Sequence, residues 1–245
     1  MECLRYQSHR PYPMERGQPL WRQRWHDLAF FHWPVDAKVL EQWVPEGVRL
    51  DLHDGCAWVS VVPFRMEDVM LRSLPAIPGV SAFPELNLRT YVERDGKPGV
   101  WFFSLDADQR LAVWAARRFF HLPYFKADMR CQETEDGGIR YRSKREFDGA
   151  MFEATYRGIE GSKVELCSGG LEYWLTERYC LYAADADGRL YRGEVHHQQW
   201  PLQEVDYHIT VNHLGDRWGI PLEGEPHYAQ FSRELEVAVW PLQPL

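Results

Sequence analysis

Runs of aromatic and branched residues, separated by turn-forming residues, recur along most of the chain and predict strands. Residues 24–35, RWHDLAFFHWPV, form one such run around a proline near its end. Residues 85–93, ELNLRTYVE, and 100–105, VWFFSL, flank the turn-forming run RDGKPG and predict a hairpin. Alternation along the first of these two strands places four side chains on one, largely polar, face: Glu85, Asn87, Arg89 and Tyr91.

Three segments have the spacing of helices. Asp36 is a suitable N-cap for a short helix that the run PEG at 45–47 ends. Residues 106–122, DADQRLAVWAARRFFHL, predict the longest helix, which begins with capping aspartates and ends before Pro123. Its apolar side, expected to pack closely on a sheet, includes Ala112, Ala115, Ala116 and Phe119. Residues 171–179 predict one or two helical turns.

Beyond Pro123 the pattern is again that of strands, and the last of them is expected within residues 226–240. Residues 71–84 contain three prolines and predict an irregular loop at a rim. About ten strands against two or three helices, with no βαβ rhythm, predict a β-rich α+β fold whose antiparallel sheets are curved or closed like a β-barrel. A basic cluster in this region is expected to be a solvated strand face: Arg140, Arg142, Lys144 and Arg145.

The organisation of the chain is expected to be simple. Residues 1–19 are polar and marked by prolines, which predicts a flexible N-terminal lead-in. Residues 20–245 show no repeat or long linker and are expected to form a single domain with a substantial core. The formal net charge of -8 opposes binding to nucleic acid, so we expect no such partner.

The cysteine pattern and the hydropathy pattern indicate a cytoplasmic protein. The five cysteines are odd in number and widely spaced, which argues against a disulfide framework and a structural zinc site. No segment reaches the ~18 consecutive apolar residues of a membrane span, so no membrane partner is expected. We also expect no cofactor and no metal, while exposed strand edges leave a homo-oligomer open.

Lys126 raises the main chemical question, because it follows a run of aromatic and apolar residues in HLPYFKADM, residues 121–129. An ammonium inside a core must be paired, neutralised or used. One interpretation is a desolvated amine that attacks a ketone or aldehyde and forms an imine. The other is a strand lysine that faces solvent or pairs with Asp128 or Glu85.

Other polar residues are candidates for ligand binding. Glu85, Asn87 and Arg89 share a strand face and could converge on a carboxylate ligand, or form an internal Glu-Arg pair that stiffens the wall. His121 and Tyr124 flank the helix-to-strand break and could reach the pocket, or serve in capping and packing. His32 is a further ligand-binding candidate. Two other pairs are not expected to be chemical: His196 and His197 face opposite ways on a strand, and Glu177 and Arg178 suggest a buried ion pair.

Several segments in the same order resemble the YqjF-like family, catalogued as a domain of unknown function: LAFFHWPVD, LDLHDGCAWVSVVPFRM, PGVSAFPELNLRTYV, FFHLPYFKADM and EVHHQQWPLQ. The resemblance covers about residues 20–241. It implies a fold similar to acetoacetate decarboxylase, whose curved sheets surround a pocket with a Schiff-base lysine. On this resemblance Glu85 takes the place of a pocket carboxylate, and Lys126 that of the reactive lysine.

Two departures from the decarboxylase pattern bear on the chemistry. That enzyme has adjacent lysines, one of which lowers the pKa of the other, whereas Phe125 and Ala127 flank Lys126 here. The pocket arginine expected before the early helix is replaced by the residues at 33–35, and Arg89 is the candidate substitute.

Two hypotheses follow for the function. The first is a pocket for a small carboxylate or carbonyl compound, with a lyase-like activity in which Lys126 forms an imine and Glu85 orients the substrate or moves a proton. The second is a non-catalytic binding or scaffold protein that retains the decarboxylase-like fold. An open cavity lined by Lys126 and Glu85 would favour ligand binding, whereas a pocket filled with Trp and Phe would favour a scaffold.

Overall fold

The computed structural model describes residues 1–72 and 81–245, apart from the side chains of Ala112 and Ala115. Most of the loop predicted at 71–84 therefore lies outside the described residues. The strands are β1 (Trp21–Val35), β2 (Arg49–Leu50), β3 (Ala57–Leu71), β4 (Phe83–Arg94), β5 (Lys97–Ala107), β6 (Tyr124–Glu133), β7 (Ile139–Arg145), β8 (Met151–Gly158), β9 (Cys180–Ala184), β10 (Leu190–His197), β11 (Val205–Asn212), β12 (Tyr228–Val239) and β13 (Gln243–Pro244). The helices are α1 (Ala37–Glu41), α2 (Arg110–Phe120) and α3 (Leu171–Thr176), with short 3-10 turns η1 (Cys3–Arg5) and η2 (Asp216–Trp218).

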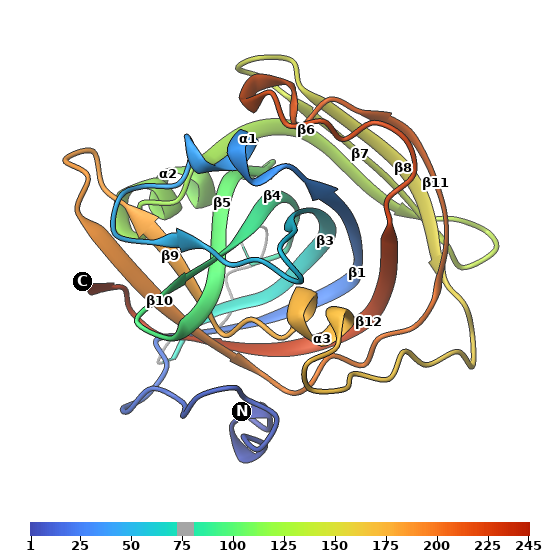
Figure 1. Cartoon of the computed structure of the whole chain (residues 1–245). Coiled ribbons are helices and arrows are strands. Elements are labelled where there is room, and N and C mark those ends of the chain that lie inside the picture. The colour runs from blue at the N-terminus through green and yellow to red at the C-terminus, as the bar shows by residue number, and fades with distance from the viewer. Residues whose placement is uncertain (73–80) are drawn as a thin grey trace.

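The strands form one sheet that curls into a ring and continues as an arm (Figure 1). The ring runs in the order β5, β9, β10, β12, β1, β3 and β4, and the pairing of β4 with β5 closes it. The arm continues from β5 through β6, β7 and β8 to β11. One apolar core lies between the arm and the ring, where Phe31 and Phe152 are in contact. A second cluster, which includes Phe30 and Trp200, forms inside the ring. The β-rich prediction is confirmed.

Two strand pairings depart from the predicted antiparallel pattern. β5 is parallel to both β6 and β9. The cause for β6 is the helix α2, which carries the chain back across the sheet so that the next strand runs in the same direction. The sequence analysis found no βαβ unit, but β5, α2 and β6 form one. The presence of this helix was predicted correctly.

The start of α2 differs from the prediction. Asp106 belongs to β5 and is buried, and the N-cap position is occupied by Gln109, whose side chain makes no capping hydrogen bond. The first helix follows its prediction, since the Asp36 carboxylate accepts a hydrogen bond from the backbone N–H of Lys38 at 3.0 Å. The predicted hairpin also forms, with the turn at residues 95–96. The short strand β2 pairs with β4, and β11 lies in a segment for which no strand was predicted.

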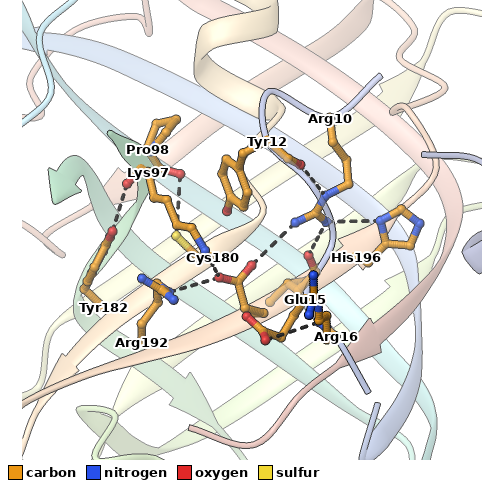
Figure 2. Close-up of polar contacts among 12 residues, drawn as sticks. Arg10, Tyr12, Glu15, Arg16, Lys97, Pro98, Cys180, Tyr182, Arg192 and His196 are labelled. Atoms are coloured by element: carbon orange, nitrogen blue, oxygen red, sulfur yellow. Dashed lines mark hydrogen bonds and ion pairs between the residues drawn. The ribbon is translucent and has the colours of Figure 1, made fainter. Parts of the chain in front are cut away.

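The N-terminal segment, expected as a flexible lead-in, packs on β10 and β12. Cys3 is fully buried against Ala238 and Trp240. The Arg10 guanidinium donates to the Val195 carbonyl at 2.9 Å and forms an ion pair with Glu194 at 3.5 Å. Figure 2 shows Arg10 together with two further cations around this buried carboxylate: Lys97 at 3.3 Å and Arg192 at 2.9 Å from Glu194. The segment therefore covers the outer side of β10.

Candidate functional site

A cavity of about 460 Å³ lies inside the ring, within the size range typical of small-molecule sites. Its wall is mostly apolar and includes Trp25, Phe83, Phe102 and Trp200. Several polar side chains interrupt this wall, namely Gln23, Ser81, Glu85, Arg89, Tyr124, Thr176, Arg178 and His197. The arrangement is that of a pocket with a few placed polar groups rather than a filled aromatic core.

Glu85 and Arg89 reach the cavity because of the alternation along β4. Their neighbours Leu86 and Leu88 point the other way, into the core between ring and arm. Opposite them, β5 contains one extra residue, since Leu88 pairs with Ser104 and Arg89 pairs with Phe102. This bulge changes the alternation, so that both Phe102 and Leu105 line the cavity.

Glu85 is a buried acid held by a tyrosine. The Tyr124 hydroxyl donates to Glu85 Oε2 at 2.6 Å. The pKa of Glu85 is raised from 4.5 to about 8, mainly by burial and to a smaller extent by the negative charge of Asp106, while the hydrogen bond from Tyr124 opposes the rise. Burial and Glu85 together raise the pKa of Tyr124 well above its usual value. At neutral pH this pair therefore presents a protonated carboxyl group that can donate a hydrogen bond.

The raised pKa of Glu85 predicts a pH-dependent loss of stability. The unfolded chain ionises Glu85 near pH 4.5, whereas the folded chain keeps the proton until about pH 8. The contribution of Glu85 to stability is therefore complete below pH 4.5 and is lost as the pH rises toward 8. The free energy of unfolding of Glu85→Gln minus that of the parent should increase by roughly 2–3 kcal/mol when the pH is raised from 5 to 7. Urea unfolding of both proteins at the two pH values measures this, and a constant difference would contradict it.

Arg89 is a buried cation to which the described residues offer no acidic partner. Its side chain lines the cavity and is 9% exposed, yet it makes no ion pair among the described residues. Its Nη2 donates a long hydrogen bond to the Leu175 carbonyl at 3.5 Å, and its Nε finds no hydrogen-bond partner among residues 1–72 and 81–245. Burial lowers its pKa, the positive charge of Arg178 contributes in the same direction, and Tyr91 opposes the shift. The expected alternative, a Glu85–Arg89 pair, does not form.

Arg178 lies near Arg89 but is neutralised. It donates to Asp51 Oδ2 at 2.5 Å and to the Trp174 carbonyl at 2.6 Å. The expected ion pair between Glu177 and Arg178 is therefore wrong. Glu177 instead accepts hydrogen bonds from the Tyr179 hydroxyl and from the Trp200 backbone N–H. Adjacent residues after a helix point in different directions, which is why they find different partners.

Lys126 lies outside the cavity lining. Its ammonium forms an ion pair with Glu146 Oε1 at 3.3 Å and donates to the Ala127 carbonyl at 2.8 Å, and its side chain is 25% exposed. Ala107 of β5 pairs with Glu85 of β4 on one side and with Lys126 of β6 on the other. Because β5 lies between them, the backbones of Glu85 and Lys126 are about 10 Å apart. The residue of β6 that reaches Glu85 is Tyr124. The structure thus places a phenol where the sequence analysis expected an amine.

The other candidates divide between the cavity and its surroundings. His32 is fully buried outside the lining, where its ring contacts Ser60 Oγ at 2.6 Å and Gln230 Oε1 at 3.0 Å. Burial lowers its pKa to about 3, with Arg89 adding to the effect, so His32 is neutral. Asn87 is buried between Glu85 and Arg89 on β4, outside the lining.

His121 ends helix α2 in a left-handed conformation, with φ 50°. Its ring stacks on that of Tyr191 at 4.7 Å between centroids, outside the cavity. These contacts correspond to the capping and packing alternative. Of the two residues at the helix-to-strand break, only Tyr124 lines the cavity.

His197 is a cavity residue that the sequence analysis did not select. Its Nδ1 donates to the Gln198 carbonyl at 2.7 Å, which leaves Nε2 as the acceptor of the neutral ring. Burial lowers its pKa to about 3. The neighbouring His196 faces the N-terminal segment, where its Nε2 contacts the Cys3 carbonyl at 2.9 Å. Within residues 1–72 and 81–245, no three His, Cys, Asp or Glu side chains come together as metal ligands.

Comparisons with known proteins agree on one family and one fold. The model of the family described as "Uncharacterized conserved protein" matches residues 22–236. The uncharacterized protein YqjF of Bacillus subtilis (strain 168) is 48% identical over 223 residues, which cover 91% of each chain.

Solved structures with the same fold have distant sequences. A structure of the enduracididine biosynthesis enzyme MppR complexed with pyruvate matches with a TM-score of 0.64 at 14% identity, covering 93% of this chain and 91% of that one. Acetoacetate decarboxylase from Legionella pneumophila matches with a TM-score of 0.59 at 13% identity, covering 96% and 92%. Similarity at this level establishes the shared fold.

Proposed function

This chain belongs to the family of uncharacterized conserved proteins, domain of unknown function 2071, and on that premise we propose that it binds a small organic acid with a carbonyl group in the cavity. The acid group pairs with Arg89. The carbonyl oxygen accepts a hydrogen bond from the protonated carboxyl of Glu85. The apolar wall contacts the body of the ligand.

The observation that carries the proposal is the buried guanidinium of Arg89. A charge removed from water is costly unless a counter-charge lies beside it. The described residues supply no carboxylate to Arg89, whereas its neighbour Arg178 pairs with Asp51. A ligand carboxylate would supply the missing charge, and the planar guanidinium suits it.

The second polar position defines the other end of the ligand. Glu85 and Arg89 are four residues apart along β4, roughly 13 Å at the backbone, and the long arginine side chain can shorten the gap. Between them the wall consists of Phe102 and Leu105. These features favour a molecule with an anionic end, an apolar middle and a carbonyl end. A structure of MppR, which shares the fold, contains pyruvate, an oxo acid whose carbonyl adjoins its carboxylate, so this comparison supports the oxo-acid class but not the separation of the two groups.

A thermal-shift series tests the proposal. It compares oxo-carboxylic acids of increasing chain length with two analogues of each acid. In one analogue the carboxylate is a methyl ester, and in the other a primary amine replaces the carboxylate. We expect the acids to raise the melting temperature, and the esters and amines to have no effect. Native mass spectrometry of freshly purified protein would detect a retained acid directly. Equal shifts from esters and acids, or no shift from any acid, would contradict the proposal.

The lyase-like activity with Lys126 as imine-forming residue is the alternative to this non-covalent binding. It requires the ammonium to leave Glu146 and enter the cavity. We expect borohydride reduction in the presence of the oxo acids to leave Lys126 unmodified, because a tyrosine occupies the position beside Glu85. Peptide mapping measures this, with the exposed Lys144 as an internal control. An adduct specific to Lys126 would establish imine chemistry and overturn the non-covalent version.

A further inference from the structure

Helix α2 is apolar on two sides, and only one of them is buried. Val113 is buried, and Ala116 and Phe120 are half-buried toward the ring. Away from that side, Leu111 is 66% exposed, Trp114 61% and Phe119 60%. The expected packing of Phe119 on the sheet is therefore wrong. Monomeric proteins rarely gather large apolar side chains on one exposed patch without a use for it.

The charge of α2 is opposite to that of the chain as a whole. Its eleven residues contain Arg110, Arg117 and Arg118, all exposed, and no acidic residue. The whole chain has a formal net charge of -8. Exposed Trp, Phe and Leu together with arginines on one helix are the features of helices that lie in a membrane interface.

The exposed patch is continuous with the cavity. Leu111 and Trp114 are exposed and also line the cavity, as do Ala116 and Phe120 on the inner side of the same helix. An apolar surface thus extends from outside the molecule into its interior along α2. Figure 1 shows α2 next to β5, with which it is in contact.

We propose that α2 is a docking face for the surface of an anionic lipid bilayer, with Leu111, Trp114 and Phe119 entering the headgroup region and the arginines contacting the anionic lipids. The contact is peripheral, since no helix among the described residues is long and apolar enough to cross a membrane. A second copy of the chain fits less well, because a symmetric contact through α2 would bring two arginine-rich helices together. The docking does not depend on the proposed ligand, although it would place the cavity mouth at the bilayer.

Vesicle flotation of the full chain tests the docking. We expect binding to vesicles of phosphatidylcholine with phosphatidylglycerol, and little binding to phosphatidylcholine alone. Raising the salt concentration should weaken it, because charge attraction contributes. Phe119→Ser and Arg118→Glu should each lower the bound fraction, by roughly fivefold or more for the charge reversal. Neither residue lines the cavity, so the thermal shifts with oxo acids should stay as in the parent.

Tyr6→Ser is the matched control. Tyr6 is 53% exposed and follows η1, at the N-terminal end that lies well away from α2 in Figure 1. It should bind vesicles like the parent. Absence of binding by the parent, or equal loss in Tyr6→Ser and Phe119→Ser, would overturn the proposal. So would a dimer in light scattering that Phe119→Ser dissociates, with no vesicle binding, since that would make α2 a self-association face.

Discussion

Arg145→Met is expected to lower the free energy of unfolding by about 3–5 kcal/mol, the cost typical of breaking a buried ion pair. The side chain of Arg145 is fully buried, and its Nε donates to Asp106 Oδ1 at 2.9 Å. A further hydrogen bond goes to Ser104 Oγ at 2.9 Å. The variant leaves the Asp106 carboxylate buried without its cation, at the junction of β5 with β6.

Chemical denaturation at pH 7.5 measures this loss. Arg142→Met is the matched control, because Arg142 lies on the same strand, pairs with Glu153 at 2.8 Å and is 33% exposed. Its replacement should cost at most about 1 kcal/mol. Similar losses in both variants would show that the Arg145 pair has no special role.

A second variant separates lost charge compensation from lost packing. Burial raises the pKa of Asp106 to about 6 even with Arg145 beside it. Asp106→Asn combined with Arg145→Met removes both charges and should be more stable than Arg145→Met alone. If packing alone mattered, the double variant would be no better than the single one.

Arg145 also shows what the sequence could and could not provide. It was grouped with Arg140, Arg142 and Lys144 as a solvated face, but it has the opposite parity along β7. Its parity places it with Ile139 and Tyr141 on the buried side. Alternation along the strand would have predicted that Arg145 is buried. The prediction of a solvated face relied instead on the clustering of positive charge.

The local elements could be predicted because their signals are local. The β4–β5 hairpin depends on alternation and on an Asp-Gly turn, and α1 depends on its Asp36 cap. The long-range pairing within the ring could not be predicted, because β5 pairs in parallel with β9, from a segment about eighty residues later. The faces of α2 were also misjudged, since a helix with apolar residues on both sides gives no preference between them.

The candidate site was predictable to the extent that it lies on one strand. Alternation along β4 placed Glu85 and Arg89 on one face, and both line the cavity. Arg178 and His197 come from distant segments, and only the closed ring brings them to the same cavity. Lys126 was selected from the apolar residues that precede it and from the resemblance, yet the residue beside Glu85 is two positions earlier, at Tyr124. Residues 124 and 126 would share a face on a regular strand. The buried positions of β6 are Tyr124, Ala127 and Met129, so the alternation shifts within the strand, and a short sequence match cannot show which side chain enters the pocket.

Arg89→Met is expected to weaken binding of the oxo acid by about a hundredfold while leaving the unliganded protein as stable as the parent or more so. The guanidinium lies 5.3 Å from the Phe30 ring and 5.8 Å from the Tyr91 ring, so a methionine would meet apolar neighbours. Replacing a buried charge by an apolar group of similar size is often neutral or stabilising. A charge-assisted hydrogen bond to the ligand contributes about 1.5–3 kcal/mol, which corresponds to the expected loss of affinity.

Weaker ligand binding without a loss of stability distinguishes a binding arginine from a structural one. Arg178→Met is the control, because Arg178 lines the same cavity but pairs with Asp51. Its removal should lower the stability and leave Asp51 uncompensated. Calorimetric titration with the oxo acid and urea unfolding without it measure both quantities for each variant. If Arg89→Met proved as destabilising as Arg178→Met and bound the acid like the parent, Arg89 would be part of the wall and the anionic end of the ligand would have to lie elsewhere.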